Sequence, residues 1–523
     1  MTFPDGTEAL RHVSFGVGRG EFVTVVGPSG CGKSTLLRIA SGLEQQTDGA
    51  VDVDRGDLGY VFQDATLLQW RTVEGNVALL AELDGMSRGE RARRVAENVS
   101  LVGLDGFADK YPRQLSGGMR MRASLARSLV MDPAIFLFDE PFGALDEITR
   151  ERLNDELLSL FQRNGFGAVH HPLDLRGGVP VDARARDVGA PWAHRRNARH
   201  PVLLPAPTRA ALRRGVRRAV RRGLDIAPER APVNMLDTPL GQGEAIIATQ
   251  TVAPATTARR RRGRIDIVGP LLVFAAFIGI WYLMHHWALR AIWDKPNFLV
   301  PTPHDVVRTA FFTNENRATL VGGLRVTATV AFLGLAIAIV VGIGLATLMA
   351  RRQWLERSMW PYLVALQAIP ILALVPLIGS IWGYGLSART LVCVIISLFP
   401  IVANTLFGLL SADKGQHDLF TLRGVSPSTR LWKLQFPAAL PAIFAGFRIA
   451  AGLSVIGAIV GELFFKRGDK GIGILLDTFR NRNNYPMAYG ALIVAALLGI
   501  VVFVIFGLIS RLVVGKWHES TRS

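Results

Sequence analysis

A glycine-rich segment near the start of the chain carries residue types that bind phosphate groups. It reads Gly27-Pro-Ser-Gly-Cys-Gly-Lys-Ser-Thr35, fits the pattern G-x-x-x-x-G-K-S/T and follows an apolar run. When a strand leads through such a loop into a helix, backbone N–H groups and the positive end of the helix dipole face an anion. The Lys33 ammonium adds a charge at the outer phosphates, and the Ser34 hydroxyl is an oxygen ligand for Mg²⁺. This spacing predicts a nucleoside triphosphate site.

Two carboxylates follow a second apolar run. Ile135-Phe-Leu-Phe138 is typical of a buried parallel strand, and Asp139 and Glu140 come directly after it. At the end of a strand, Asp139 is placed to hold Mg²⁺ through water, and Glu140 is placed to orient the water that attacks a γ-phosphate. An Asp-Glu pair is otherwise an ordinary helix cap, but the phosphate loop upstream favours the catalytic interpretation.

A third stretch, Leu115-Ser-Gly-Gly-Met119, completes a resemblance to the nucleotide-binding domain of ATP-binding cassette (ABC) transporters. The stretch is similar to the family signature. The resemblance implies that Ser116, Gly117 and Gly118 of one copy close over the γ-phosphate held by a second copy. Gln63 resembles the family glutamine whose amide reaches Mg²⁺ and whose loop meets the membrane domain.

The resemblance therefore implies three groups of site residues. The catalytic group is Glu140, Lys33 and Gln63, and the Mg²⁺ group is Ser34, Gln63 and Asp139. The ATP-binding group is Gly27, Pro28, Ser29, Gly30, Cys31, Gly32, Lys33, Ser34, Thr35, Ser116, Gly117 and Gly118.

The second half of the chain reads as a membrane domain. The chain has 523 residues, of which 50% are hydrophobic, and the apolar residues gather after Arg264. Six runs approach or exceed the ~20 residues that cross a bilayer as a helix. Basic residues at Arg259–Arg264 put the first end on the cytoplasmic side, although the basic loop 466–482 then falls outside. The runs lie near 265–286, 322–350, 359–382, 390–411, 441–464 and 487–513.

Three features of the membrane half lead to further predictions. Thr421-Leu-Arg-Gly424 and the prolines after it resemble the importer motif in which a short cytoplasmic helix, turned at Gly424, enters a cleft beside the Gln63 loop. A solvated loop is the alternative. The run 471–476 is expected to form a short helix on the outer surface. Arg448, and Arg325 and Glu462 near span ends, are expected to reach toward the headgroups.

An arginine-rich segment, 169–234, fits neither half. It has fourteen arginines, no lysine and five acidic residues, and it lacks a sustained helical or strand period. A basic nucleic-acid-binding linker is one interpretation. Our preferred hypothesis is a single-nucleotide frame change, because the shifted frame encodes a string resembling the family segment around its switch histidine. His170 and His171 are the alternative switch histidines, but no apolar strand is evident before them.

Together these features predict an α/β P-loop NTPase domain of the ABC type, truncated at its C-terminal end, and an all-α six-helix transmembrane permease domain. The expected domains are residues 1–168 and 265–516, joined by a disordered linker over 169–264. Cys31 and Cys393 imply no disulfide framework. A soluble cassette ATPase is disfavoured by the six spans, and an exporter by the order of the domains.

The predicted function is ATP-driven import of a small solute across a bacterial inner membrane. The stretch after Gln63 resembles nitrate, sulfonate and taurine importers, which indicates an anion.

The implied cofactors are ATP and Mg²⁺. The implied partners are a second copy, a periplasmic or lipid-anchored substrate-binding protein and membrane lipid, and no nucleic acid is expected. The nucleotide-binding half and both termini are expected in the cytoplasm. The alternative is a frameshifted fusion product that binds nucleotide but hydrolyses it poorly.

Overall fold

The N-terminal part of the protein is built on a parallel sheet. The computed structural model describes residues 1–18, 21–27, 30–140, 167–170, 179–180, 265–465 and 468–518. Within the described residues the strand order is β2-β3-β4-β1-β5, and every pair is parallel. The strands are β1 (Phe22–Val26), β2 (Leu58–Val61), β3 (Ile135–Phe138), β4 (Gly167–His170) and β5 (Val179–Pro180).

Helices pack on the sheet and bury its apolar strands. They are α1 (Lys33–Ser41), α2 (Val73–Val77), α3 (Leu79–Leu83), α4 (Arg88–Leu101) and α5 (Gly117–Leu129), with 3₁₀ turns at Arg55–Asp57 and Pro112–Gln114. Phe136 and Phe138 of β3 pack with α2, α4 and α5, whereas Leu137 packs with Leu37 of α1. Since alternate residues of β3 enter different clusters, both faces of this strand are covered, as its continuous apolar run predicts. The α/β fold class is confirmed.

The sheet includes residues of the arginine-rich segment 169–234. Strand β4 includes His170, and β5 pairs with β1 further along the chain. The expectation that no strand leads into His170 is therefore wrong. The run before this histidine, Phe166-Gly-Ala-Val169, is short and contains glycine and alanine, so it does not read as a strand. The backbone is nevertheless extended because β1 and β3 pair with β4 along its two edges.

The C-terminal part is helical, and its long helices match the predicted spans. Five described helices are long and apolar enough to cross a membrane, or up to six if the bent pair α13 and α14 forms one span. This pair bends by 97°. Pro370 lies at the break, where proline disfavours helical backbone in the residue before it. The main helices are α9 (Ile265–Leu283), α12 (Asn314–Arg351), α13 (Gln353–Ala368), α14 (Ile371–Trp382), α15 (Leu386–Leu410), α18 (Phe436–Phe465) and α20 (Tyr485–Val514).

Short elements connect these spans. Between α9 and α12 lie η4 (Met284–Ala288), α10 (Leu289–Ala291), η5 (Asn297–Leu299), α11 (Pro303–Val307) and η6 (Arg308–Phe312). Between α15 and α18 lie α16 (Lys414–Leu422), α17 (Pro427–Arg430) and η7 (Leu431–Gln435), and α19 (Ile472–Asn481) precedes α20.

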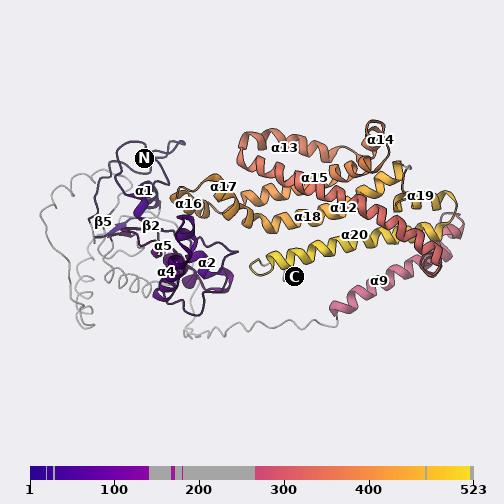
Figure 1. Ribbon diagram of the computed structural model, residues 1–523, viewed down its shortest axis with the longest axis horizontal. Helices are drawn as coiled ribbons and strands as arrows, with labels where there is room; N and C mark the ends of the chain where they lie inside the picture. Colours follow the sequence, from indigo (N-terminus) through magenta and orange to yellow (C-terminus); the bar gives the residue numbers. More distant parts are fainter. Residues whose placement is uncertain are drawn as a thin grey trace, which may run out of the picture. The chain divides into compact units, whose positions relative to one another are not determined.

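Small residues allow the central membrane helices to approach closely. Helices α12, α15 and α18 run side by side (Figure 1), and α15 contacts both of its neighbours. A Cβ added at Gly334 of α12 would lie 2.3 Å from the Cβ of Cys393 on α15. A Cβ at Gly446 of α18 would lie 2.9 Å from that of Asn404. Glycine is therefore needed at these crossings, as is common where helices pack within a bilayer.

The short helix predicted near 471–476 is present as α19. Ile472 and Leu475 are buried and pack with Leu320 of α12 and Ala491 of α20. Because α19 places its apolar side among the long helices, it is part of the bundle core.

Candidate functional site

The phosphate loop connects β1 to α1. Gly27 follows β1, Pro28 and Ser29 lie outside the described residues, and Gly32 is the N-cap of α1 with φ +91°. A Cβ at Gly32 would also lie 2.5 Å from the carbonyl oxygen of Ala9, so only glycine suits this position. The Lys33 side chain is buried, and its Nζ donates to the Gly27 carbonyl oxygen at 2.9 Å. The ammonium thus lies over the loop that the sequence predicts to hold phosphates.

The fold brings together two predicted Mg²⁺ ligands that are far apart in the sequence. The Ser34 hydroxyl donates to Asp139 Oδ1 at 2.7 Å, and the Tyr60 hydroxyl donates to Asp139 Oδ2 at 3.3 Å. Asp139 follows β3, and its N–H donates to the Val61 carbonyl oxygen of the neighbouring strand. A hydroxyl and a carboxylate this close are hard oxygen ligands of the kind Mg²⁺ prefers. The residues present therefore fit this ion.

Tyr60 is a site residue that sequence reasoning missed. It lies on β2 and is 4% exposed, and burial together with the neighbouring Asp139 raises its pKa, so its hydroxyl stays protonated and donates. A tyrosine within an apolar strand reads as ordinary core. Only the pairing of β2 with β3 indicates that its hydroxyl reaches Asp139.

The structure also describes Glu140, Gln63 and the signature residues. Glu140 has φ +45°, a left-handed conformation that is uncommon for a residue with a side chain and is typical of functional strain. Gln63 is exposed in the loop after β2. Ser116 is the N-cap of α5 and accepts from the Met119 N–H, and Ser116 and Gly117 are exposed. Among the described residues no hydrogen bond joins the signature segment to the phosphate loop of the same chain.

A short helix of the membrane half contacts the loop after Gln63. This helix, α16, is hereafter the coupling helix, and it ends just before Gly424, whose φ is +56°. Gln416 of the coupling helix donates to the Leu67 carbonyl oxygen at 3.1 Å, and Leu419 and Phe420 are buried in a cluster with Leu68. The prediction of a helix turned at Gly424 and placed beside the Gln63 loop is confirmed.

The same helix also contacts α1, which begins at the phosphate loop. Asp418 accepts from Arg38 Nη1 at 2.6 Å, and the two side chains are only 14% and 20% exposed. Burial opposes the charged guanidinium, but the hydrogen bond with Asp418 raises the pKa of Arg38. Arg38 lies one turn after Ser34, so this ion pair links the coupling helix to the helix that carries a predicted Mg²⁺ ligand.

A second set of ion pairs connects α3 to the segment after the coupling helix. Glu82 accepts from Lys433 at 2.7 Å and from Arg71 at 2.7 Å. Partial burial favours the neutral acid, but the hydrogen bonds from these two cations lower the pKa of Glu82 to about 2. At the rim, Arg423 lies 3.4 Å from Asp84. Glu82 is therefore a charged link between the two halves at neutral pH.

Glu462 does not reach toward the headgroups, which corrects the expectation for this residue. It is fully buried on α18, and both carboxylate oxygens lie 2.9 Å from the Thr327 hydroxyl of α12. The Gly473 N–H also donates to Glu462, and the Ile472 N–H donates to Thr327. The carboxylate and the Thr327 hydroxyl thus each accept from one free N–H group at the start of α19, which compensates part of the cost of burying them. Arg448 lies 4.4 Å from the centre of the Phe503 ring, as a cation–π pair between α18 and α20.

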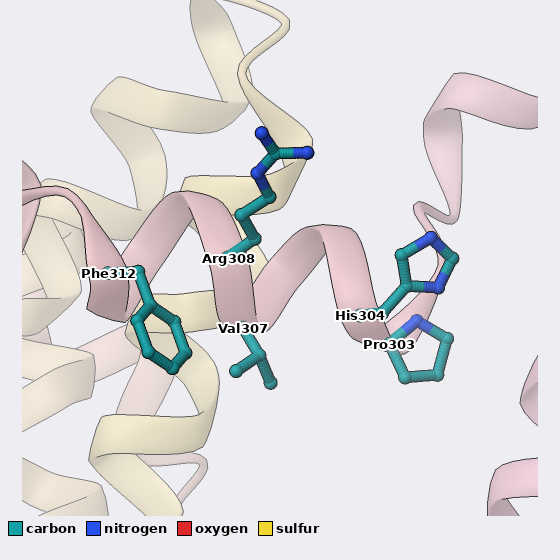
Figure 2. A pocket seen from close by; sticks show the side chains of 5 residues that line it. All are labelled: Pro303, His304, Val307, Arg308 and Phe312. Atoms are coloured by element: carbon teal, nitrogen blue, oxygen red, sulfur yellow. The ribbon is translucent and has the colours of Figure 1, made fainter.

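An open hollow of about 650 Å³ lies along α11 and η6. Figure 2 shows its lining side chains, in which Arg308 points away from Val307 and Phe312. Phe312 is 78% exposed. None of the predicted site residues lines this hollow.

Comparison with known proteins agrees with both halves. The family described as ABC transporter matches residues 10–143, and the family described as binding-protein-dependent transport system inner membrane component matches residues 338–518. An uncharacterized ABC transporter ATP-binding protein of Methanocaldococcus jannaschii is 48% identical over 163 residues, which are 30% of this chain and 61% of that protein.

Two further relatives carry names that state a substrate. The taurine import ATP-binding protein TauB of Pseudomonas aeruginosa is 44% identical over 174 residues, 32% of this chain and 66% of that protein. The aliphatic sulfonates import ATP-binding protein SsuB 1 of Pseudomonas savastanoi pv. phaseolicola is 45% identical over 171 residues, 32% of this chain and 70% of that protein. The chain thus spans less than two thirds of the first two of these relatives.

The phosphate loop, the parallel sheet and the apolar helices define a nucleotide-binding membrane protein with several spans. With the matches above, the chain belongs to the ABC transporter family. It joins an ATP-binding domain and a permease domain in one polypeptide.

Proposed function

We propose that the chain is one half of an ATP-driven importer for a small anion such as taurine, an alkylsulfonate or nitrate. Two copies would bind ATP between their N-terminal domains, and a separate binding protein would deliver the solute to the permease domains. The nucleotide-binding half is assigned to the cytoplasm. The observation that carries the proposal is the coupling helix, which contacts both the loop after Gln63 and the helix after the phosphate loop. The relatives named for taurine and sulfonate import support the substrate class.

In this mechanism the residues have distinct tasks. Backbone N–H groups of the phosphate loop and the Lys33 ammonium hold the phosphates, and Ser34 and Asp139 would hold Mg²⁺, which neutralises phosphate charge when bound. Glu140 orients the attacking water and accepts its proton. Ser116 and the two glycines after it contact the γ-phosphate held by the second copy, since a helix N-terminus favours an anion.

A histidine at the end of β4 or directly after it would complete the site. The backbone register places His170 opposite Phe138, the residue before Asp139. We assign the switch role to His170 or His171, and their separate alanine variants distinguish them. Loss of the active histidine should reduce hydrolysis by about 10²–10³, the usual effect of removing one transition-state donor. The frame-change hypothesis concerns residues 169–234, of which only 169–170 and 179–180 lie within the described residues, and resequencing the locus tests it.

The test of the proposed function is vanadate-sensitive ATP hydrolysis by the purified full chain in proteoliposomes, with Glu140→Gln as the matched control. An importer half should hydrolyse ATP, and the control should bind a fluorescent ATP analogue but not turn over. ATP binding without hydrolysis by the natural chain would instead support the frameshifted fusion product. Uptake of labelled taurine, methanesulfonate and nitrate, with the candidate binding protein added, then identifies the solute.

A further inference from the structure

The guanidinium of Arg127 is fully buried at the centre of the N-terminal domain. Arg127 lies on α5, the helix that begins after Ser116, and it is 0% exposed. Its Nη1 donates to the Thr66 carbonyl oxygen at 2.9 Å. Its Nη2 donates to the Ala65 carbonyl oxygen at 3.1 Å, to the Thr66 hydroxyl at 2.8 Å and to the Ser124 hydroxyl at 3.1 Å. Three of these four bonds tie α5 to the loop after Gln63.

Burying a charged group among neutral acceptors is costly, and the four hydrogen bonds of Arg127 offset part of that cost. The planar fork of arginine reaches two successive carbonyl groups, which a lysine ammonium does not reproduce. Burial lowers the pKa of Arg127 to about 9, which leaves it charged at neutral pH. The arrangement fixes the position of α5 relative to residues 65 and 66.

The loop that Arg127 holds is fixed on its other sides as well. Asn76 is fully buried, and its side chain accepts from the Leu68 N–H at 2.7 Å and donates to the Leu68 carbonyl oxygen at 3.1 Å. Thr66 has φ +46°, a strained conformation for a β-branched residue that persists only when its surroundings hold it in place. Segment 65–68 is therefore held in one conformation by Arg127 and Asn76.

The coupling helix contacts Thr66, the same residue that Arg127 holds. A Cβ added at Gly415 would lie 2.7 Å from Thr66 Cγ2, so the coupling helix approaches Thr66 as closely as a glycine permits. The next residue, Gln416, donates to the Leu67 carbonyl oxygen. Thr66 is thus held between Gly415 of the membrane half and Arg127 of the signature helix.

We propose that Arg127 is a positioning residue that transmits displacement of the coupling helix, through segment 65–68, to the signature residues Ser116–Gly118. From Arg127 back to Ser116, α5 spans eleven residues, about 16 Å of continuous helix that moves as one body. The role of this link in transport rests on the proposed function. Movement of the permease domain would accordingly displace the signature segment of the same copy. Because that segment is proposed to contact the nucleotide bound by the second copy, the displacement would reach that nucleotide.

The experiment is a double-mutant cycle read by hydrogen–deuterium exchange of the full chain in lipid nanodiscs. Gly415→Ala pushes a methyl group against Thr66, and exchange is followed in the peptide covering 116–122. We expect Gly415→Ala to change this exchange about fivefold in the natural chain, and less than about twofold when Arg127→Gln is also present. Gly452→Ala is the matched control, because its Cβ would meet no described heavy atom within 4 Å.

A purely structural role for Arg127 gives a different pattern. Arg127→Gln would then raise exchange by itself, but the effect of Gly415→Ala would be unchanged, and this additive result overturns the proposal. No response of the 116–122 peptide to Gly415→Ala in the natural chain also overturns it. If Arg127→Gln does not fold, Arg127→Lys keeps the charge, loses the two-carbonyl contact and should still reduce the Gly415→Ala effect.

The exchange experiment does not require ATP turnover, so failure of the proposed function is distinguishable from failure of this inference. Affinity for a fluorescent ATP analogue, measured on the same samples, should change less than about twofold in Arg127→Lys. Within the described part of the chain, the hydrogen bonds of Arg127 go to residues 65, 66 and 124, and none of these is a predicted phosphate-binding residue.

Discussion

The ion pair between Asp418 and Arg38 should hold the coupling helix on the N-terminal domain. The oxygen and nitrogen are 2.6 Å apart, and both side chains are more than three-quarters buried. Asp418→Asn keeps the shape and one acceptor but removes the charge. Since a charge-assisted hydrogen bond is about twice as strong as a neutral one, we expect a loss of about 1–2 kcal/mol. The open form of this contact should then become about 5- to 30-fold more populated.

The assay measures how often the contact opens. Leu419 is 2% exposed in the cluster beneath the coupling helix, so a cysteine at this position reacts with a water-soluble maleimide mainly when the helix separates. In a Leu419→Cys background, Asp418→Asn should raise the rate of the maleimide reaction about 5- to 30-fold. The matched control is Asp84→Asn. The Asp84 carboxylate is 37% exposed, compared with 14% for Asp418, and it lies 3.4 Å from Arg423, whose side chain is 8% exposed. A long contact to a solvated carboxylate is worth less than a short contact to a buried one, so its loss should change the rate less than about twofold.

Two results would refute this reasoning. An Asp418→Asn rate within twofold of the parent would mean that the ion pair does not hold the helix. An equally large effect of Asp84→Asn would mean that general charge, and not the buried contact, determines opening.

Three further predictions follow from other contacts. Asp139→Asn should reduce Mg²⁺-dependent hydrolysis at least about a hundredfold, while binding of a fluorescent ATP analogue without Mg²⁺ is retained. Because the pKa of Glu82 is lowered to about 2, its stabilising link to Lys433 should be complete above about pH 4.5 and be lost as the pH falls toward 2. The trapping rate of the Leu419→Cys chain, divided at each pH between 5 and 3 by the rate of the same chain with Glu82→Gln, measures this, because the pH dependence of the thiol itself cancels in the ratio. Thr327→Val should speed hydrogen exchange at the start of α19 about fivefold or more, since the Ile472 N–H and Glu462 lose a partner; unchanged exchange would contradict the anchoring role.

Local patterns in the sequence predicted the main parts of the fold because each part depends on neighbouring residues. The glycine spacing before Lys33 indicates a loop that opens a helix, and the apolar run before Asp139 indicates a buried strand. The long apolar runs likewise indicate membrane helices. Strand β4 could not be found in this way, because its extended backbone depends on hydrogen bonds with β1 and β3 and not on its own residues.

The sequence by itself determined which residue types could bind a nucleotide and which segments could cross a membrane. Only the tertiary structure decided which of them meet. The contacts of Ser34 with Asp139, of Arg38 with Asp418 and of Thr327 with Glu462 join residues 105, 380 and 135 positions apart. No periodicity encodes such pairs, because hydrogen-bond geometry at that separation is set by the packing of strands and helices between them. For the same reason Arg127 reads as one more basic residue on a helix until its four acceptors are seen.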